Sequence, residues 1–174
     1  IFDANFASLG ALLESLGATV IDCGRVGDTA EKTRAALKAA AADSDCVIST
    51  GGVSVGEEDH VRSAVEALGN IALWKLAIKP GKPFAFGRIG KDEGEACPFF
   101  GLPGNPVSAF VTFARIVRPC LFALQGATPQ SPLTFPVRSG FARPRSGVRQ
   151  EYLRATLKSD EEGGLAALPL GNQS

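Results

Sequence analysis

The chain has 174 residues, of which 45% are hydrophobic, and its 18 basic residues balance 18 acidic ones. This composition is that of a globular protein with a full core, and a net charge of zero gives no general attraction to nucleic acid or to an anionic membrane. No apolar stretch reads as a membrane span and the first residues do not resemble a signal peptide, so we expect a cytoplasmic protein that binds neither nucleic acid nor membranes.

The start of the chain predicts a helix, a strand and a second helix. An apolar stripe over residues 6–16 predicts a helix that Asn5 caps and Gly17 ends. Residues 19–22 are β-branched and apolar, as in a strand. A capping-box spacing at residues 28–31 then precedes an alanine-rich segment, which predicts the second helix.

The same alternation continues past residue 45. Residues 46–48 form a short β-branched run that predicts a buried strand, and apolar residues recur at helical spacing from Val61 to Leu68. Strands connected by helices predict a parallel arrangement. We therefore expect an α/β fold, with three α/β/α layers and a mostly parallel sheet.

The middle of the chain predicts three strands and a long helix. Residues 71–74 and 84–87 read as strands around a lysine-rich turn, and residues 98–102 read as a strand after an exposed hairpin tip. Asn105 followed by Pro106 predicts a helix entrance, with a capping side chain and a proline at the first helical position. We expect the helix to bend or shorten at Pro119.

The composition changes after Gly126, which suggests a domain boundary. We expect an α/β domain over residues 1–126, a linker over 127–134 and a small β-domain over 135–174, because short strands there alternate with turn residues. Both ends of the sequence are abrupt, so we interpret the chain as a piece of a longer protein with a truncated β-domain. The spacing of its four cysteines fits no CxxC pair or zinc site, and we expect buried free thiols.

Three loops are expected to meet at one edge of the sheet. The first is a glycine-rich loop after the 46–48 strand, the second is the lysine-rich turn, and the third is residues 103–108. Open α/β sheets bind ligands where strands end, and glycines let backbone N–H groups approach an anion. The alternative for each loop is an ordinary solvated turn. The candidate binding residues are Gly51, Gly52, Ser54, Gly56, Lys75, Lys79 and Lys82, followed by Pro103, Asn105, Pro106 and Ser108.

Carboxylates follow the glycine loop directly. Asp59, with Glu57 beside it, has the oxygen ligands that suit a hard cation such as Mg²⁺, although acidic residues at a helix start also stabilise the helix dipole. Asp3 is ambiguous, since it can simply cap the first helix. His60 has no partner at the spacing of a catalytic triad or a metal site.

The order and spacing of the three loops resemble those of the molybdopterin molybdenumtransferase family, which includes gephyrin. The resemblance rests on residues 51–59, 79–83 and 101–108 and covers residues 1 to about 126. It implies insertion of molybdate into adenylylated molybdopterin with Mg²⁺, in a homodimer, with a molybdopterin adenylyltransferase as a possible partner.

The resemblance also implies roles for single residues. It makes Asp59 and Asp3 the catalytic carboxylates, with the metal at Asp59 and Glu57, and it puts the three lysines and residues 103–108 around the pterin and molybdate. Arg149 and Ser174 match positions that contribute to oxyanion binding. The strand with which the family's domain begins is missing here, as are its amino-terminal domains, so the piece alone is not expected to turn over.

Two other functions fit the same fold. A scaffold module would bind a peptide in an apolar groove beside the β-domain, as gephyrin does with receptor tails, and a pyrophosphatase-like relative would hydrolyse nucleotide derivatives. A dinucleotide-binding domain is disfavoured, because the glycine loop lacks the GxGxxG spacing.

Overall fold

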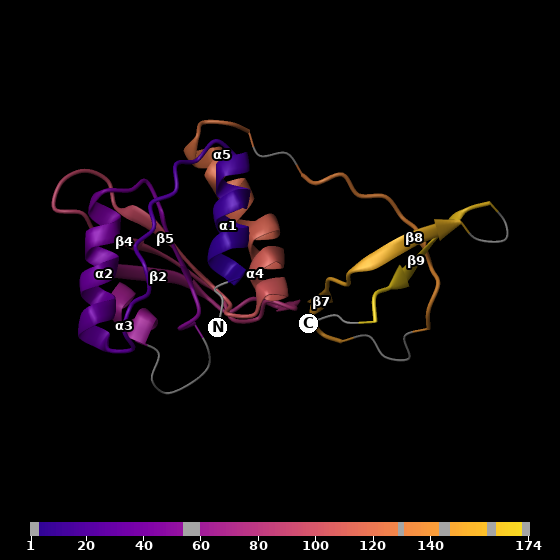
Figure 1. Cartoon of the computed structure of the whole chain (residues 1–174), viewed down its shortest axis with the longest axis horizontal. Coiled ribbons are helices and arrows are strands. Elements are labelled where there is room, and N and C mark those ends of the chain that lie inside the picture. The colour runs from indigo at the N-terminus through magenta and orange to yellow at the C-terminus, as the bar shows by residue number, and fades with distance from the viewer. Residues whose placement is uncertain (1–3, 54–59, 129–130, 143–146, 160–162, 172–174) are drawn as a thin grey trace.

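The computed structural model describes residues 4–53, 60–128, 131–142, 147–159 and 163–171 (Figure 1). Five α-helices, one π-helical turn and nine strands make up these parts of the chain. In order they are α1 (Ala4–Ser15), α2 (Ala30–Ala42), β1 (Val47–Thr50), α3 (His60–Leu68), β2 (Gly69–Trp74), β3 (Ile78–Lys79), β4 (Ala85–Ile89), β5 (Cys97–Leu102), α4 (Pro106–Thr112), η1 (Phe113–Val117), α5 (Arg118–Leu124), β6 (Arg138–Ser139), β7 (Gln150–Glu151), β8 (Ala155–Ser159) and β9 (Leu165–Pro169).

The main sheet has the strand order β1-β5-β4-β2 and is mixed. Strands β1 and β5 are parallel, whereas β4 is antiparallel to both β5 and β2. The expectation of a mostly parallel sheet is therefore wrong for the described strands. The reason is the connection over residues 90–96, which is a hairpin loop, and a short loop joins antiparallel neighbours.

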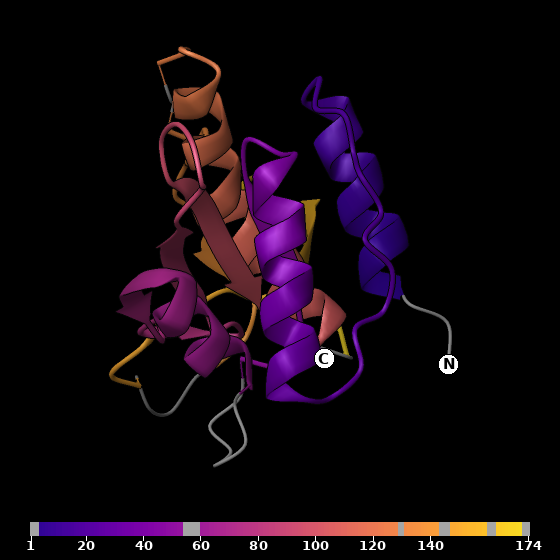
Figure 2. The same cartoon turned by 90° about the vertical axis from the view of Figure 1, so that its left-hand side faces the viewer.

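Helices cover both faces of this sheet, which confirms the α/β class and its three layers. Helices α2 and α3 pack on one face, and α1, α4, η1 and α5 pack on the other (Figures 1 and 2). Neighbouring side chains of β5 point to opposite faces, so Phe99 belongs to the first core and Phe100 to the second. Both residues are at most 1% exposed. The central strand thus holds the two layers of helices together.

The connection between α1 and α2 differs from its prediction. Residues 18–28 contain no strand, and Ile21 is 58% exposed. A β-branched sequence forms a strand only where a neighbouring strand supplies a ladder, and none of the described strands pairs with this segment. Gly17 does end α1 with a positive φ of 78°, as expected. The cap of α2 lies one residue later than predicted, at Thr29, whose side chain accepts from the Lys32 N–H.

The predicted long helix runs from Pro106 to Leu124 with an irregular middle. The π-helical turn η1 precedes Pro119, which lies in the first turn of α5. Proline lacks an N–H and its ring collides with the carbonyl four residues earlier, so a widened turn before it accommodates the ring. The helix is thus not shortened at Pro119, and the irregularity expected there takes the form of a π turn.

The same helix corrects an expectation about apolar segments. Within the described residues, Pro106–Leu124 is the only helix whose length and composition would suit a membrane span. Core helices pass the same test, and Phe113, Val117 and Leu121 are buried against the sheet. Its length and composition are therefore no evidence that it spans a membrane.

The final part of the chain forms a small sheet of order β6-β9-β8. Strand β9 is parallel to β6 and antiparallel to β8. Strand β7 belongs elsewhere, because it pairs in parallel with β3 of the α/β part. The first of the short strands expected in the segment 135–174 is only Arg138–Ser139, and Phe135 lies before it and is 58% exposed. The boundaries at residues 126 and 134 stay predictions.

Candidate functional site

The end of β1 forms a tight glycine turn beside the end of β5. Because these strands are parallel, both finish at the same edge, and the Gly51 N–H donates to the Leu102 carbonyl at 3.0 Å. Gly51 and Gly52 have φ angles of 81° and 68°, which side chains disfavour. A Cβ on Gly52 would lie 2.6 Å from a methyl carbon of Val61. The turn therefore needs glycine for its conformation and its packing.

The end of β5 leads directly into the helix entrance. The Asn105 side-chain oxygen accepts from the Ser108 N–H at 3.0 Å and from its hydroxyl at 3.2 Å, and Pro106 follows at the first helical position. This confirms the predicted cap. Gly104 lies close to the glycine turn, since a Cβ on it would be 3.8 Å from the Gly51 Cα. Two of the three predicted loops are thus in contact.

A cavity of about 350 Å³ lies between these two loops. Its walls are backbone-rich, because three of its lining residues are glycines and two are prolines, and backbone groups with few side chains let a ligand approach closely. A hollow of about 430 Å³ lies elsewhere, between α5 and residues 127–133. Only the first is bordered by predicted site residues, and it is lined by Gly51, Gly52, Val53, Pro83, Pro103, Gly104, Asn105 and Ser108.

The lysine turn closes on itself next to this cavity. The Lys75 N–H donates to the Phe84 carbonyl at 2.8 Å, and the Leu76 N–H donates to the Lys82 carbonyl at 2.9 Å. Gly81, with a φ of 110°, packs tightly against Thr112 of α4. The three lysine side chains are exposed and do not line the cavity, to which this turn contributes Pro83. The lysines therefore lie at its margin rather than inside it.

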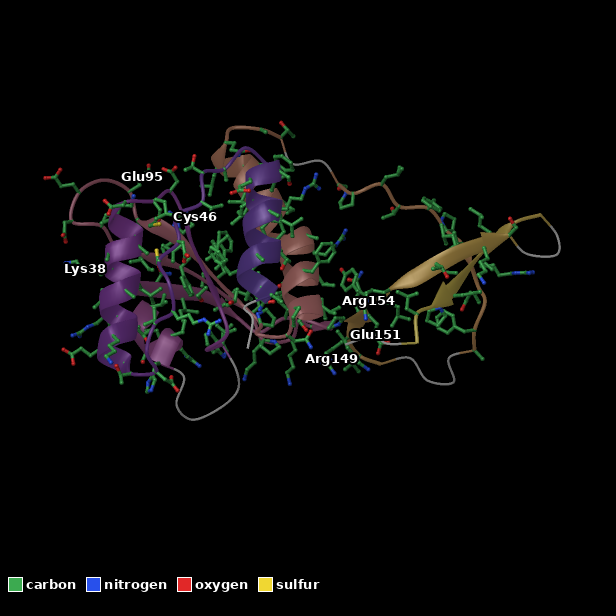
Figure 3. All side chains as sticks on the ribbon, viewed as in Figure 1. Lys38, Cys46, Glu95, Arg149, Glu151 and Arg154 are labelled. Carbon is green, nitrogen blue, oxygen red and sulfur yellow. The ribbon has the colours of Figure 1, made fainter. Side chains whose placement is uncertain are left out.

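Strand β7 brings Arg149 to the lysine turn. In the ladder of β3 and β7, Ile78 is opposite Gln150 and Lys79 is opposite Glu151, so Arg149 falls one position before this ladder. Figure 3 shows Arg149 and Glu151 at the junction of the α/β layers with the small sheet. Arg149 is exposed there. The structure thus brings Arg149 close to the lysine turn, and its role in oxyanion binding stays a prediction.

Six of the predicted site residues lie outside the described residues. They are Asp3, Ser54, Gly56, Glu57, Asp59 and Ser174. The described side chains contain no group of three or more His, Cys, Asp or Glu that would hold a metal ion. Since the candidate carboxylates lie outside this set, the magnesium site stays a prediction.

His60 is near Asp28, with 4.0 Å between Nε2 and Oδ1.

Asn5 contributes to the site in a way that the sequence did not reveal. It lies inside α1, is 6% exposed, and its amide donates to the Gly104 carbonyl at 2.9 Å, so the prediction that it caps the helix is wrong. Its Oδ1 and the Ser49 hydroxyl are buried, without a hydrogen-bond partner among the described residues. The two residues of this hydrogen bond are 99 positions apart, so no local sequence pattern predicts it. The position of Asn5 two residues after Asp3 is its only signal.

The four cysteines are free thiols, as expected, but the expectation that they are buried holds fully only for Cys97, since Cys46 and Cys120 are partly buried and Cys23 is exposed. Burial raises the pKa of Cys46 to about 11, with smaller contributions from Cys97 and Asp45. Burial also raises the pKa of Cys97 and of Cys120. Protonated buried thiols are poor nucleophiles. Cys46 and Cys97 lie where β1 and β5 begin, at the edge of the sheet opposite to the cavity.

Comparisons with known proteins agree on one family. A family model described as "Probable molybdopterin binding domain" matches residues 1–123. A molybdopterin molybdenumtransferase from Haemophilus influenzae is 39% identical over 174 residues, which are 99% of this chain and 42% of the relative. The molybdenum cofactor synthesis protein cinnamon from Drosophila melanogaster is 36% identical over 178 residues, which cover 99% of this chain and 28% of that protein.

A solved structure has the same fold. The crystal structure of the molybdopterin biosynthesis moea protein from Pyrococcus horikosii matches with a TM-score of 0.72 and 27% identity, over 98% of this chain and 40% of that one. The chain thus spans less than half the length of these relatives.

Proposed function

The chain belongs to the family described as the probable molybdopterin binding domain, and from this premise we propose that its protein inserts molybdate into adenylylated molybdopterin, as a molybdopterin molybdenumtransferase. The observation that carries the proposal is the cavity between the Gly51-Gly52 turn and residues 103–108, with the lysine turn at its margin. Relatives with this activity in their names support it.

Different parts of the site would bind the pterin phosphate and the molybdate. The glycine turn and the Gly104 loop would admit the pterin phosphate, because a backbone without side chains lets an anion approach. Lys75, Lys79 and Lys82 would attract molybdate, which is a tetrahedral dianion, through charge-assisted hydrogen bonds. Arg149 and Ser174 would add to this oxyanion site. The pterin dithiolene, a soft ligand, would receive the metal.

Carboxylates would complete the site. Asp59 and Glu57 have the oxygen donors that suit Mg²⁺, and Asp3 is two residues before Asn5, which is bonded to the Gly104 loop. When bound, Mg²⁺ would neutralise phosphate charge. Homodimerisation, a molybdopterin adenylyltransferase as partner and a cytoplasmic location belong to the same proposal, and the greater length of the relatives leaves room for further contributing domains.

The test is a titration of the full-length protein with adenylylated molybdopterin, with and without Mg²⁺ and molybdate. We expect Asp59→Ala to abolish magnesium-dependent molybdenum transfer without changing the thermal midpoint, because the variant loses an oxygen ligand of the ion. Asp92→Ala is the matched control, since Asp92 is 87% exposed and pairs with Lys38.

Three outcomes are informative. Loss of transfer in Asp59→Ala alone supports the proposal. Unchanged transfer in Asp59→Ala contradicts the role of this carboxylate. Ligand binding that responds to neither ion contradicts the transferase and favours a binding module.

A further inference from the structure

Strand β7 holds the lysine turn by its backbone. The Gln150 N–H donates to the Ala77 carbonyl at 3.0 Å, and the Tyr152 N–H donates to the Lys79 carbonyl at 2.8 Å. These two bonds flank Ile78, so the backbone on both sides of it is tied to the final part of the chain. The position of Lys79 is therefore set by a segment far away in the sequence.

A side-chain contact reinforces the ladder. The Lys79 Nζ lies 3.5 Å from the Glu151 Oε1, with 55% of the lysine side chain and 22% of the glutamate side chain exposed. On the next residue, the Tyr152 ring receives the Arg115 guanidinium of η1 at 5.6 Å. Strand β7 is thus attached both to the lysine turn and to the long helix, and its carboxylate faces the ammonium group of Lys79.

The ion pair with Glu151 weakens the electrostatic attraction between Lys79 and an anion. A carboxylate next to an ammonium group cancels much of its field, and an anion that approaches Lys79 is attracted by one group and repelled by the other. The repulsion grows with the charge of the anion, so a dianion is affected more than a monoanion. The Glu151 side chain is only 22% exposed, and interactions of partly buried charges are screened less by salt than those of fully exposed ones.

We propose that Glu151 is a specificity-determining residue that moderates the affinity of Lys79 for tetrahedral oxyanions and keeps a dianion exchangeable. This inference rests on the proposed function, which puts Lys79 at the molybdate site. The lysines attract the oxyanion, and Glu151 limits how tightly it is held. A loosely held oxyanion can leave the lysine turn for the pterin.

The test compares two tetrahedral anions of different charge in the full-length protein. Molybdate is a dianion and perrhenate is a monoanion of similar shape. We expect Glu151→Gln to tighten perrhenate binding about threefold and molybdate binding about tenfold, because the removed repulsion scales with anion charge. Isothermal titration calorimetry gives both dissociation constants.

Three variants serve as controls. Glu151→Asp keeps the charge, so its ratio of molybdate to perrhenate affinity should stay close to that of the wild type. Asp92→Asn removes an exposed carboxylate from the pair with Lys38 and should change neither affinity. Lys79→Gln should weaken molybdate more than perrhenate. Thermal midpoints check that each variant is folded, since a structural role would lower the affinity for both anions.

The outcomes separate this inference from the proposed function. Unchanged or weaker molybdate binding in Glu151→Gln, with normal binding in the wild type, overturns the inference alone. Failure of the wild type to bind molybdate, or equal binding in Lys79→Gln, overturns the proposed site and the inference with it. A tenfold gain for molybdate that exceeds the gain for perrhenate supports both.

Discussion

The four-stranded main sheet and the small β6-β9-β8 sheet are stabilised in different ways. The main sheet is covered by helices on both faces, and the side chains of its central strand β5 are almost fully buried. In the small sheet, Leu157 of β8 and Leu165 of β9 are 47% and 48% exposed. The described part of the small sheet therefore has little core of its own, and the β3–β7 ladder attaches the neighbouring strand to the main domain. A rigid domain builds the cavity, and a more weakly supported region reaches its margin.

Removal of one apolar side chain from each sheet is expected to give the largest difference in stability. Phe99→Ala should lower the free energy of unfolding by about 3–5 kcal/mol, because a buried ring leaves a cavity. Leu157→Ala should lower it by less than about 1 kcal/mol, since half of that side chain already contacts water. Urea denaturation followed by circular dichroism measures both. Equal losses would mean that the small sheet has a core comparable to that of the main sheet.

A smaller effect is expected at the glycine turn of the rigid region. Gly52→Ala should destabilise the protein by about 1–3 kcal/mol and weaken ligand binding, because a Cβ is strained at this positive φ and meets Val61. Val61→Ala in the same chain should restore part of the loss, by removing the clash but not the strain. Gly104→Ala is the matched control for stability alone, since its Cβ would make ordinary contact with Gly51. Denaturant midpoints distinguish the three, and a neutral Gly52→Ala would contradict the tight turn.

The smallest effect is expected at the junction. Arg115→Leu removes the cation from the Tyr152 ring, a contact of about 0.5–1 kcal/mol, while the main core stays intact. Hydrogen exchange of the Gln150 and Tyr152 amides should then speed up by about two- to fivefold, because both bonds join β7 to β3.

The control for this prediction has the same kind of contact in the rigid region. Arg62 lies 5.2 Å from the Trp74 ring centroid, between α3 and β2. Arg62→Leu should leave exchange at β7 unchanged. If both variants speed it up equally, the junction has no separate stability.

Two local features of the candidate site were predicted better than the directions of the strands. The glycine turn and the helix entrance at Asn105 are local features, since φ angles and caps depend on neighbouring residues, and the parallel β1–β5 pair brings them to one edge. The antiparallel orientation of β4 and β5 follows from the hairpin tip that the sequence did predict between them, but the rule that helix-connected strands are parallel was extended to the whole sheet. The segment at 19–22 has strand-like residues without a neighbouring strand.

Long-range contacts account for the rest of what the sequence missed. The Asn5 amide donates to the Gly104 carbonyl, and Glu151 forms an ion pair with Lys79. In both cases the two residues are far apart in the sequence, and no local motif indicates which residue is the partner. The sequence shows a lysine-rich turn and, far from it, a glutamate. The β3–β7 ladder is what places Glu151 next to Lys79. The catalytic carboxylates Asp3 and Asp59 remain predictions, because both lie outside the described residues.

The π-helical turn η1 has a consequence for the rotation of the long helix. A π turn holds more residues than an α turn, so the helix after it is rotated about its axis relative to an unbroken α-helix, in which each residue advances by about 100°. If the same residues formed an unbroken α-helix, α5 would be rotated about its axis and Leu121 would turn away from the sheet. The widened turn thus sets the angular phase at which the second half of the helix meets the core, while Arg115 within it points to Tyr152.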